Sequence, residues 1–265
     1  MTHLSERELQ LSTLEFPKIF KRVINDKSVI SLGPGEPDFV TPKPLLEYAK
    51  KIIPKGTHYS EPQGMLELRE AIVKKLKKEN KIKTHPENIL ITCGSQEALF
   101  ASLLTTIDPT EQVIMPSPGY VGYLPAIELV NGIPIFLELD EEDNFEINPD
   151  RLKKLIDKKR TKAIIINTPS NPTGNVLSRK VLEELEDIAI DNDLYIFSDE
   201  AYEKIIYEGK HISVGSLNGM KDYVVSFFTF SKTYAMCGFR LGYCSVPSKL
   251  VNPLIKTSEY MTLCA

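Results

Sequence analysis

The sequence predicts an α/β protein with a mostly parallel sheet of seven strands and helices on both faces. Short apolar runs alternate along the chain with segments of helical periodicity, which is typical of parallel strands joined by helical crossovers. The chain of 265 residues can bury a large core and is near the size at which a second domain is expected. Its hydrophobic content of 42% and charged content of 26% are typical of a soluble globular protein.

The expected elements follow in order along the chain. Strands are predicted where apolar runs end in turn residues, at 89–92, 112–115, 133–139, 163–167, 194–198, 224–230 and 241–246. Helices are predicted at 65–80, 95–106, 120–131, 149–158 and 178–192, with a last helix from Leu250 to Cys264.

The first of these helices shows the basis of the predictions. Four apolar side chains share one face, and they are Met65, Leu68, Ile72 and Leu76. Four lysines lie largely off that face, and they are Lys74, Lys75, Lys77 and Lys78. We interpret these lysines as a solvated helix face rather than as an anion-binding patch.

The first 44 residues differ from the rest because prolines and glycines crowd the stretch 33–44. Such a segment is expected to be extended and turn-rich, suited to crossing between domains and to lining a cleft. We therefore expect residues 1–44 to form an N-terminal arm and part of a smaller α/β domain. Residues 45–265 are expected to form a large domain.

Composition limits the possible partners. The net charge of -4 gives no reason to expect nucleic acid. The charged N-terminus lacks the apolar core of a signal peptide and no apolar run could span a bilayer, so we expect a cytoplasmic protein without membrane contact. The scattered histidines are interpreted as surface residues, and no metal is expected. Four cysteines without disulfide or metal spacing are interpreted as small core residues in a reducing compartment, namely Cys93, Cys237, Cys244 and Cys264.

Lys232 is the residue on which the functional interpretation depends. It follows the apolar run 224–228, lies next to Ser231, and precedes Arg240 by eight residues. An amine attacks an aldehyde only when it is unprotonated, so a lysine partly withdrawn from water and close to a second cation becomes a usable nucleophile. The guanidinium of Arg240 can also bind phosphate bidentately, together with the hydroxyl of Thr229 or Ser231. An isolated Ser-Lys pair is usually a surface feature, but this combination points to pyridoxal phosphate.

Three further segments place polar residues at the predicted carboxyl ends of strands, where ligands collect in open α/β sheets. One strand ends at Asp199 and is followed by Tyr202, and a second runs into a turn-rich loop that contains Asn171. A third leads to Gly94, before a helix whose free amides can cradle a phosphate. Each segment alone fits an ordinary turn or helix cap, but together they are specific.

These residues resemble the fold-type I enzymes that depend on pyridoxal phosphate, in particular the class I and II aminotransferases of the aspartate aminotransferase type. The matching motifs recur in family order and are Leu32-Gly33-Pro34-Gly35-Glu36-Pro37-Asp38-Phe39, Tyr59 with Gly64, Gly94-Ser95-Gln96-Glu97-Ala98-Leu99, Asn171-Pro172-Thr173-Gly174, Ser198-Asp199-Glu200-Ala201-Tyr202, Ser231-Lys232-Thr233 and Gly238-Phe239-Arg240-Leu241-Gly242-Tyr243. The resemblance implies the cofactor-binding large domain of this fold for residues 45–265. It also implies transfer of an amino group between an L-amino acid and a 2-oxo acid by a ping-pong mechanism.

The resemblance further implies a role for each catalytic residue. Lys232 resembles the lysine that forms the internal aldimine and later moves a proton between the substrate Cα and the cofactor. Asp199 resembles the carboxylate that keeps the pyridine nitrogen protonated, so that the ring can accept electrons. Tyr202 and Asn171 resemble the groups that hydrogen-bond the phenolic oxygen of the cofactor.

Binding roles are implied in the same way. The residues expected around the cofactor phosphate are Gly94, Ser95, Gln96, Thr229, Ser231 and Arg240. Tyr120 is expected to stack on the cofactor ring, and Gly35 and Asn171 are expected to bind the substrate. Tyr59 is expected to reach the phosphate of the neighbouring subunit, which implies a homodimer.

Two departures from the family pattern bear on function. The chain stops at Ala265 inside a predicted helix that has no cap, which favours a fragment without the C-terminal part of the small domain and its carboxylate-binding arginine. Gln96 stands where some members that act on acidic substrates have lysine or threonine, so the substrate is left open. A carbon-sulfur or other β-lyase on the same scaffold and a non-catalytic cofactor-binding regulator are the alternatives.

Overall fold

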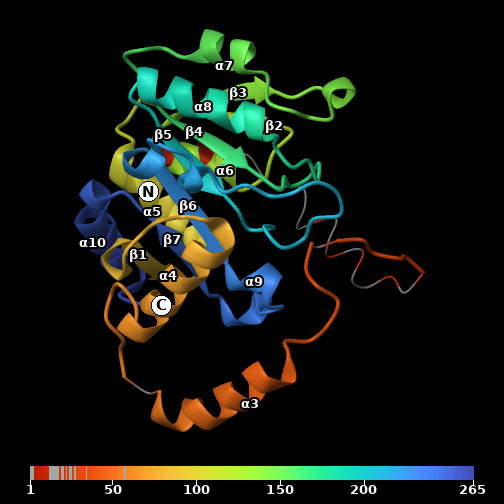
Figure 1. The fold of residues 1–265 in the computed structure, drawn as a ribbon, viewed down its shortest axis with the longest axis vertical. Helices are drawn as coiled ribbons and strands as arrows, with labels where there is room; N and C mark the ends of the chain where they lie inside the picture. The colour runs from red at the N-terminus through yellow and green to blue at the C-terminus, as the bar shows by residue number, and fades with distance from the viewer. Residues whose placement is uncertain are drawn as a thin grey trace.

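The computed structural model of the chain describes residues 3–11, 18, 21, 23, 26, 28–33, 35–56 and 58–265. Its centre is a seven-stranded sheet in the order β1-β7-β6-β5-β4-β2-β3 (Figure 1). The strands are β1 (Ile89–Thr92), β2 (Gln112–Ser117), β3 (Ile133–Glu138), β4 (Thr161–Asn167), β5 (Tyr195–Asp199), β6 (Val224–Thr229) and β7 (Gly242–Ser245). Neighbouring strands from β3 to β6 are parallel, whereas β7 runs antiparallel to β6 and β1. The predicted fold class is confirmed.

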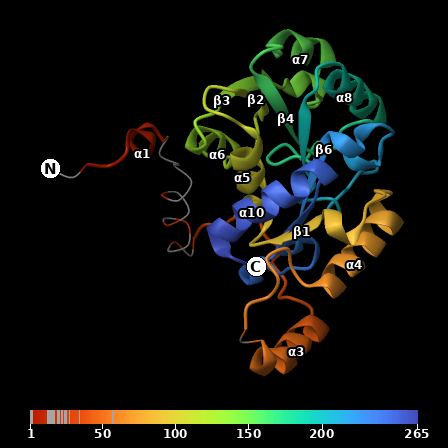
Figure 2. The same ribbon diagram turned by 90° about the vertical axis from the view of Figure 1, so that its left-hand side faces the viewer.

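Helices cover both faces of the sheet, as Figure 2 shows. They are α1 (Glu6–Gln10), α3 (Lys43–Ile52), α4 (Leu66–Lys75), α5 (Ser95–Thr106), α6 (Tyr123–Leu129), α7 (Pro149–Leu155), α8 (Arg179–Asp191), α9 (Phe230–Thr233) and α10 (Val251–Thr262). Each predicted helix is present, with ends that shift by up to a few residues. Helices α1, α3 and α9 lie where the sequence predicts none. The four-residue helix α9 is a single turn, too short to show a periodic pattern.

Two apolar clusters hold the helical layers against the sheet. One includes Leu103 of α5, Ile127 of α6 and Leu254 of α10, and the other includes Leu152 of α7 and Leu182 of α8. All five side chains are fully buried. Because burial of one such side chain contributes roughly 1.5–3 kcal/mol, these layers fix the strands whose ends carry the polar residues.

Helix α4 departs from its predicted start and end. The predicted first residue, Met65, precedes the helix and its side chain is exposed. Ile72 and Leu76 are buried as expected, in a third apolar cluster shared with β1 and β7. After α4 the chain continues through one π-helical turn, Leu76–Asn80, which places Asn80 in the interior. Single π turns are often associated with functional sites.

Two residues interpreted as surface groups are instead partly buried, with side chains that are mostly shielded from solvent. The Lys75 ammonium forms an ion pair with Glu203, and the Lys75 side chain is only 14% exposed. His211 lies 2.8 Å from Glu200, and its side chain is only 7% exposed. The interpretation as surface groups is therefore wrong for both residues, since each has a buried carboxylate partner that sequence periodicity does not reveal.

The N-terminal segment is described in part, and Pro34 of its predicted turn-rich stretch lies outside the described residues. Within the described part, several large apolar side chains are exposed, namely Ile30, Leu32, Phe39 and Val40. Thr41 Oγ1 donates a hydrogen bond to Ala235 O, which ties the end of this segment to the loop after α9. The division into an arm of residues 1–44 and a large domain stays a prediction.

Candidate active site

A cavity of about 700 Å³ lies at the carboxyl ends of β4, β5 and β6. Open α/β sheets bind ligands at this edge because parallel strands present their carboxyl ends together there. The predicted site residues that line the cavity are Gly35, Ser95, Gln96, Tyr120, Asn171, Asp199, Tyr202, Thr229, Ser231, Lys232 and Arg240. The fold thus gathers residues from distant parts of the chain around one volume.

Lys232 lies in α9, directly after β6. Thr229 caps this helix, since its Oγ1 accepts a hydrogen bond from the backbone N–H of Ser231 at 3.1 Å. The Lys232 Nζ donates to Gly35 O and lies 5.8 Å from the centre of the Tyr202 ring. The amine is therefore held between the N-terminal segment and the loop after β5.

Asp199 ends β5, and both of its carboxylate oxygens have donors. Oδ1 accepts a hydrogen bond from Ala201 N at 3.1 Å, and Oδ2 accepts one from the Tyr123 hydroxyl at 2.8 Å. Burial is the largest influence and raises the pKa of Asp199, while these two donors act in the opposite direction. The donors therefore favour the charged form of a carboxylate that burial alone would protonate more readily.

Tyr123 is a site residue that the sequence analysis missed. Its side chain is fully buried in α6, where burial first and the Asp199 charge second raise the pKa of the phenol well above its usual value. The hydroxyl consequently keeps its proton and donates a hydrogen bond to Asp199. A tyrosine inside an amphipathic helix is ordinarily a packing residue. The only feature of the sequence that could have indicated Tyr123 was its spacing of three residues from Tyr120, about one helical turn.

The loop after β4 is tied to β5 by a second residue that the sequence analysis missed. Asn167 Nδ2 donates to Asp199 O at 3.0 Å, and Asn167 Oδ1 accepts from Asn171 N at 2.6 Å. Burial and the Asp199 charge raise the pKa of Tyr202, whereas a hydrogen bond with the Asn171 side chain lowers it. Asn167 occupies the last position of a strand before a turn-rich loop, which could have indicated it.

The first turn of α5 and Arg240 together form a pocket for an anion. Gly94 precedes the helix at φ 81°, and the first amides of any helix, here those of Ser95 and Gln96, have no partner within it. Arg240 Nη1 donates to Cys237 O at 2.9 Å and approaches Ser231 Oγ at 3.5 Å. These contacts fix the guanidinium beside the helix start.

Two glycines allow this close packing. A Cβ at Gly94 would lie 2.7 Å from Arg240 Nη2, and one at Gly242 would lie 2.5 Å from Ser95 N. Backbone amides, hydroxyls and a guanidinium suit a phosphate dianion. An amine and a buried carboxylate in the same cavity suit the aldehyde and ring nitrogen of pyridoxal phosphate. The residues present therefore fit this cofactor.

Tyr59 is separate from this cavity, and its side chain is 83% exposed. Its expected role at a neighbouring subunit stays a prediction. Within the described residues, no helix has the length and apolar character needed to cross a membrane. The same residues contain no group of three or more His, Cys, Asp or Glu side chains placed to hold a metal ion.

Comparison with known proteins places the chain in a family. The family model for aminotransferase class I and II matches residues 27–265. The aspartate aminotransferase of Pyrococcus abyssi is 43% identical over 264 residues, which cover 98% of this chain and 68% of that protein. Aromatic-amino-acid aminotransferase 2 of Thermococcus litoralis has the same identity and coverage. The solved structure of the Thermus thermophilus aspartate aminotransferase with maleate gives a TM-score of 0.94 at 33% identity, covering 99% of this chain and 69% of that one.

These similarities favour the predicted transferase over the β-lyase and regulator alternatives, because the relatives are named as aminotransferases. The cavity already described contains donors that fit the cofactor of such enzymes. The chain belongs to the aminotransferase class I and II family, and it is a pyridoxal-phosphate-dependent aminotransferase whose substrates are amino acids and 2-oxo acids.

Proposed function

We propose that Lys232, Asp199 and Tyr202 are the catalytic residues of this aminotransferase. The observation that carries the proposal is that the Lys232 amine and the Asp199 carboxylate line the same cavity. Bound pyridoxal phosphate supplies an aldehyde that an amine can capture and a ring that accepts the electrons released at the substrate Cα. Lys232 would hold the cofactor covalently and, once displaced by the substrate amine, take the proton from Cα.

Asp199 would bind the ring nitrogen of the cofactor. A carboxylate binds the N–H of a pyridinium most strongly while it is charged, because it then also supplies the countercharge. The hydrogen bonds from Tyr123 and Ala201 support that charge, and they orient the carboxylate at the end of β5. Tyr202 and Asn171 would donate hydrogen bonds to the phenolic oxygen on the other side of the ring, and Tyr120 would pack on its face.

The phosphate would be held by the pocket at the start of α5. Its donors are the amides of Ser95 and Gln96, the hydroxyls of Thr229 and Ser231, and the Arg240 guanidinium. A helix N-terminus and a fixed guanidinium both favour a dianion, so this pocket would supply much of the binding energy for the cofactor. Gly94 contributes by lacking a side chain where Arg240 approaches.

The substrate would enter beside Gly35 and Asn171. Gly35 has an exposed backbone and no side chain to obstruct a carboxylate, and its carbonyl already contacts the Lys232 amine. Relatives are named for aspartate and for aromatic amino acids. Gln96 is a neutral amide in the cavity, which supports a broader choice than acidic substrates alone.

The wider organisation is also a proposal. We propose a homodimer in which Tyr59 reaches the cofactor phosphate of the partner subunit, and the exposure of this side chain supports that role. Residues 1–44 would form an arm and part of a small domain against the large domain of residues 45–265. All four cysteines are free, which supports a reducing cytoplasmic location.

Cofactor trapping tests the central assignment. The protein is incubated with pyridoxal phosphate, reduced with borohydride and digested, and the modified peptide is identified by mass spectrometry. We expect the modification on Lys232 and none on the variant Lys232→Ala. Modification of another lysine in the wild-type protein would refute the assignment.

Amino acid titration then tests the reaction type. Amino acids are added singly to the loaded protein, and the cofactor absorbance, ammonia and the 2-oxo acid are measured. Transfer of nitrogen to the cofactor without ammonia release is the result expected of an aminotransferase. Release of ammonia with an unchanged cofactor would favour the β-lyase, and cofactor attachment without any turnover would favour the regulator.

A further inference from the structure

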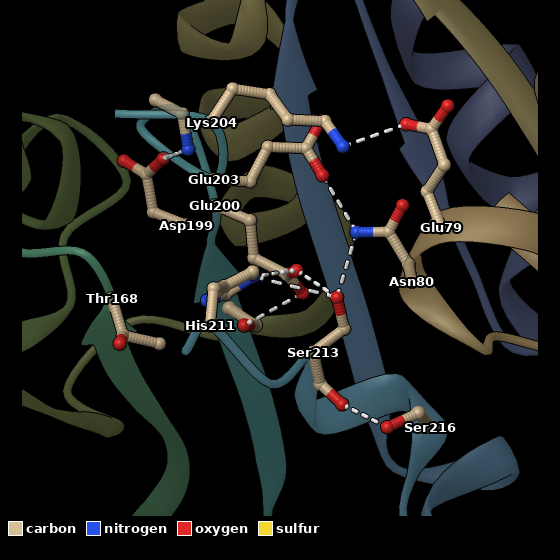
Figure 3. Close-up of polar contacts among 12 residues, drawn as sticks. Glu79, Asn80, Thr168, Asp199, Glu200, Glu203, Lys204, His211, Ser213 and Ser216 are labelled. Carbon is tan, nitrogen blue, oxygen red and sulfur yellow. Dashed lines mark hydrogen bonds and ion pairs between the residues drawn. The ribbon is translucent and has the colours of Figure 1, made fainter. Parts of the chain in front are cut away.

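The polar side chains at the end of β5 and in the segment after it point in two directions, some into the active-site cavity and some into the protein interior. Asp199, Ala201 and Tyr202 line the active-site cavity. Glu200 and Glu203, in the same segment, are buried and turn instead into a polar network that Figure 3 shows in part. We name this group the anchor network, and its members are Lys75, Asn80, Glu200, Glu203, His211 and Ser213.

The two carboxylates of the anchor network are held by several donors. Glu200 Oε2 accepts a hydrogen bond from the Ser213 hydroxyl and lies 2.8 Å from His211 Nε2. Asn80 Nδ2 donates to Glu203 Oε2 at 2.7 Å and to Ser213 Oγ at 2.8 Å, and so links the two carboxylates (Figure 3). The segment that carries Asp199 is therefore fixed from behind, on the side away from the cavity.

Lys75 extends the anchor network to the strand that carries the reactive lysine. Its ammonium forms the buried ion pair with Glu203 and lies 4.7 Å from the centre of the Phe228 ring. Phe228 is in β6, four residues before Lys232, and its ring is buried against Tyr243. One ammonium thus contacts both the segment of Asp199 and the strand that leads to Lys232.

Stability alone gives a weak reason for this arrangement. Burying an ion pair costs desolvation, and well-packed apolar residues of similar volume often stabilise a protein equally or better. Removing one partner, however, leaves an uncompensated buried charge and is strongly destabilising. The ion pair links α4 to the segment of Asp199, and the same ammonium contacts Phe228 in the strand that leads to Lys232. This arrangement therefore favours a role in the relative position of the two segments, which catalysis by oriented groups requires.

We propose that Lys75 is a positioning residue that sets the distance between the Lys232 and Asp199 segments through its contacts with Phe228 and Glu203. The inference rests on the proposed roles of Lys232 and Asp199. Lys75 acts from the far side of these segments, so its effect on the reaction passes through backbone placement. The π-helical turn after Lys75 serves the same arrangement, because it brings Asn80 to the other oxygen of Glu203.

The experiment separates position from stability with a charge-balanced variant. Lys75→Met and Glu203→Gln are made singly and together, and Lys74→Met is the matched control from an exposed position of the same helix. For each protein, the thermal midpoint, the rate of covalent attachment of pyridoxal phosphate and the kcat of the loaded enzyme are measured. Attachment is followed by absorbance, so one readout is independent of turnover.

We expect Lys75→Met to lower the thermal midpoint because Glu203 is left unpaired, and we expect the double variant to recover it. The double variant should still attach the cofactor about tenfold more slowly and show a similar loss in kcat, because misplacement by about 1 Å can cost up to about 100-fold. Recovery of both stability and attachment rate in the double variant would overturn the proposal. So would an effect of equal size in Lys74→Met.

Two further outcomes have defined meanings. If Lys75→Met does not fold, Glu203→Gln decides alone, since an amide keeps the acceptor for Asn80 and nearly the same volume. Slower attachment in folded Glu203→Gln supports the positioning role, and the wild-type rate overturns it. Absence of cofactor attachment in the wild-type protein would refute the proposed function. A loss of attachment confined to the variants concerns only the proposed role of Lys75.

Discussion

Replacing Tyr123 by phenylalanine tests how the charge of Asp199 is maintained. The change removes one hydroxyl and leaves the buried ring, which packs edge-on against Tyr120 at 5.3 Å. A hydrogen bond to a charged group contributes about 1.5–3 kcal/mol, which corresponds to roughly 10- to 150-fold in rate if it is all expressed in the transition state. Because the hydroxyl opposes the effect of burial, its loss raises the pKa of Asp199.

The sign of the pH effect follows from this shift. A higher pKa leaves more of Asp199 protonated at a given pH, and the neutral acid supplies no countercharge for the protonated ring nitrogen of the cofactor and accepts its N–H more weakly. The acid limb of the kcat/KM profile should therefore move to higher pH, with the largest loss of activity at low pH. Profiles of kcat/KM against pH for the wild type and Tyr123→Phe measure the displacement.

A matched control and a double variant sharpen the test. Tyr243→Phe removes another buried phenol, on β7, where burial likewise raises the pKa of the hydroxyl. It should leave the acid limb in place. In an Asp199→Asn background, Tyr123→Phe should add little further loss, because the two side chains act together. An unchanged acid limb in Tyr123→Phe, or fully additive losses in the double variant, would refute the reasoning.

Three other predictions concern stability and cofactor binding. Asp199→Asn should raise the thermal midpoint of the cofactor-free protein near neutral pH, because burial raises the pKa of Asp199 and makes its charge costly in the folded state. Calorimetry should show this gain shrinking as the pH falls through the raised pKa of the folded state and vanishing below the usual value of 3.8, where the folded and unfolded carboxyls are both protonated. Gly242→Ala should destabilise the protein by about 1–3 kcal/mol and weaken pyridoxal phosphate binding, since a Cβ would lie 2.5 Å from Ser95 N. Urea unfolding measures the change in stability and equilibrium titration measures the change in binding. Unchanged values would contradict the close approach of Gly242 to Ser95. Arg240→Lys should weaken pyridoxal phosphate binding about tenfold while leaving the thermal midpoint of the cofactor-free protein nearly unchanged, because an ammonium lacks the bidentate geometry of a guanidinium.

The sequence predicts the sheet well because its strands are short, buried and apolar. Strand β1 and helix α5 have the predicted ends, Ile89–Thr92 and Ser95–Thr106, since Gly94 separates an apolar run from a helical pattern. Asp199, the loop of Asn171 and the helix after Gly94 could be predicted from the sequence because the carboxyl ends of parallel strands converge on one edge. Gly35 and Tyr120, which also line the cavity, were implied only by the family resemblance. Helix α9 could not be predicted, because a single turn has no periodicity to detect.

Three of the residues that sequence reasoning missed share a physical feature. Tyr123, Lys75 and His211 each contact a carboxylate that is distant in the sequence, at separations of 76, 128 and 11 residues. These residue types occur both in packed helices and on solvated surfaces, and only the tertiary fold decides which environment each side chain has. Local pattern therefore identifies the groups that face the cavity more readily than those that support them.

The hydrogen bonds and ion pairs around Asp199, Lys232 and Glu203 indicate how the structure holds each of these side chains. The proposed role of Asp199 requires a charged carboxylate in a buried position, which is unfavourable for folding, and donors from α6 and the backbone offset this cost. The Lys232 amine donates a hydrogen bond to the carbonyl of Gly35, which carries no full charge. Glu203, in the segment after β5, forms its ion pair with Lys75 of α4. The cavity therefore contains an amine and a carboxylate that each have hydrogen-bond partners of their own.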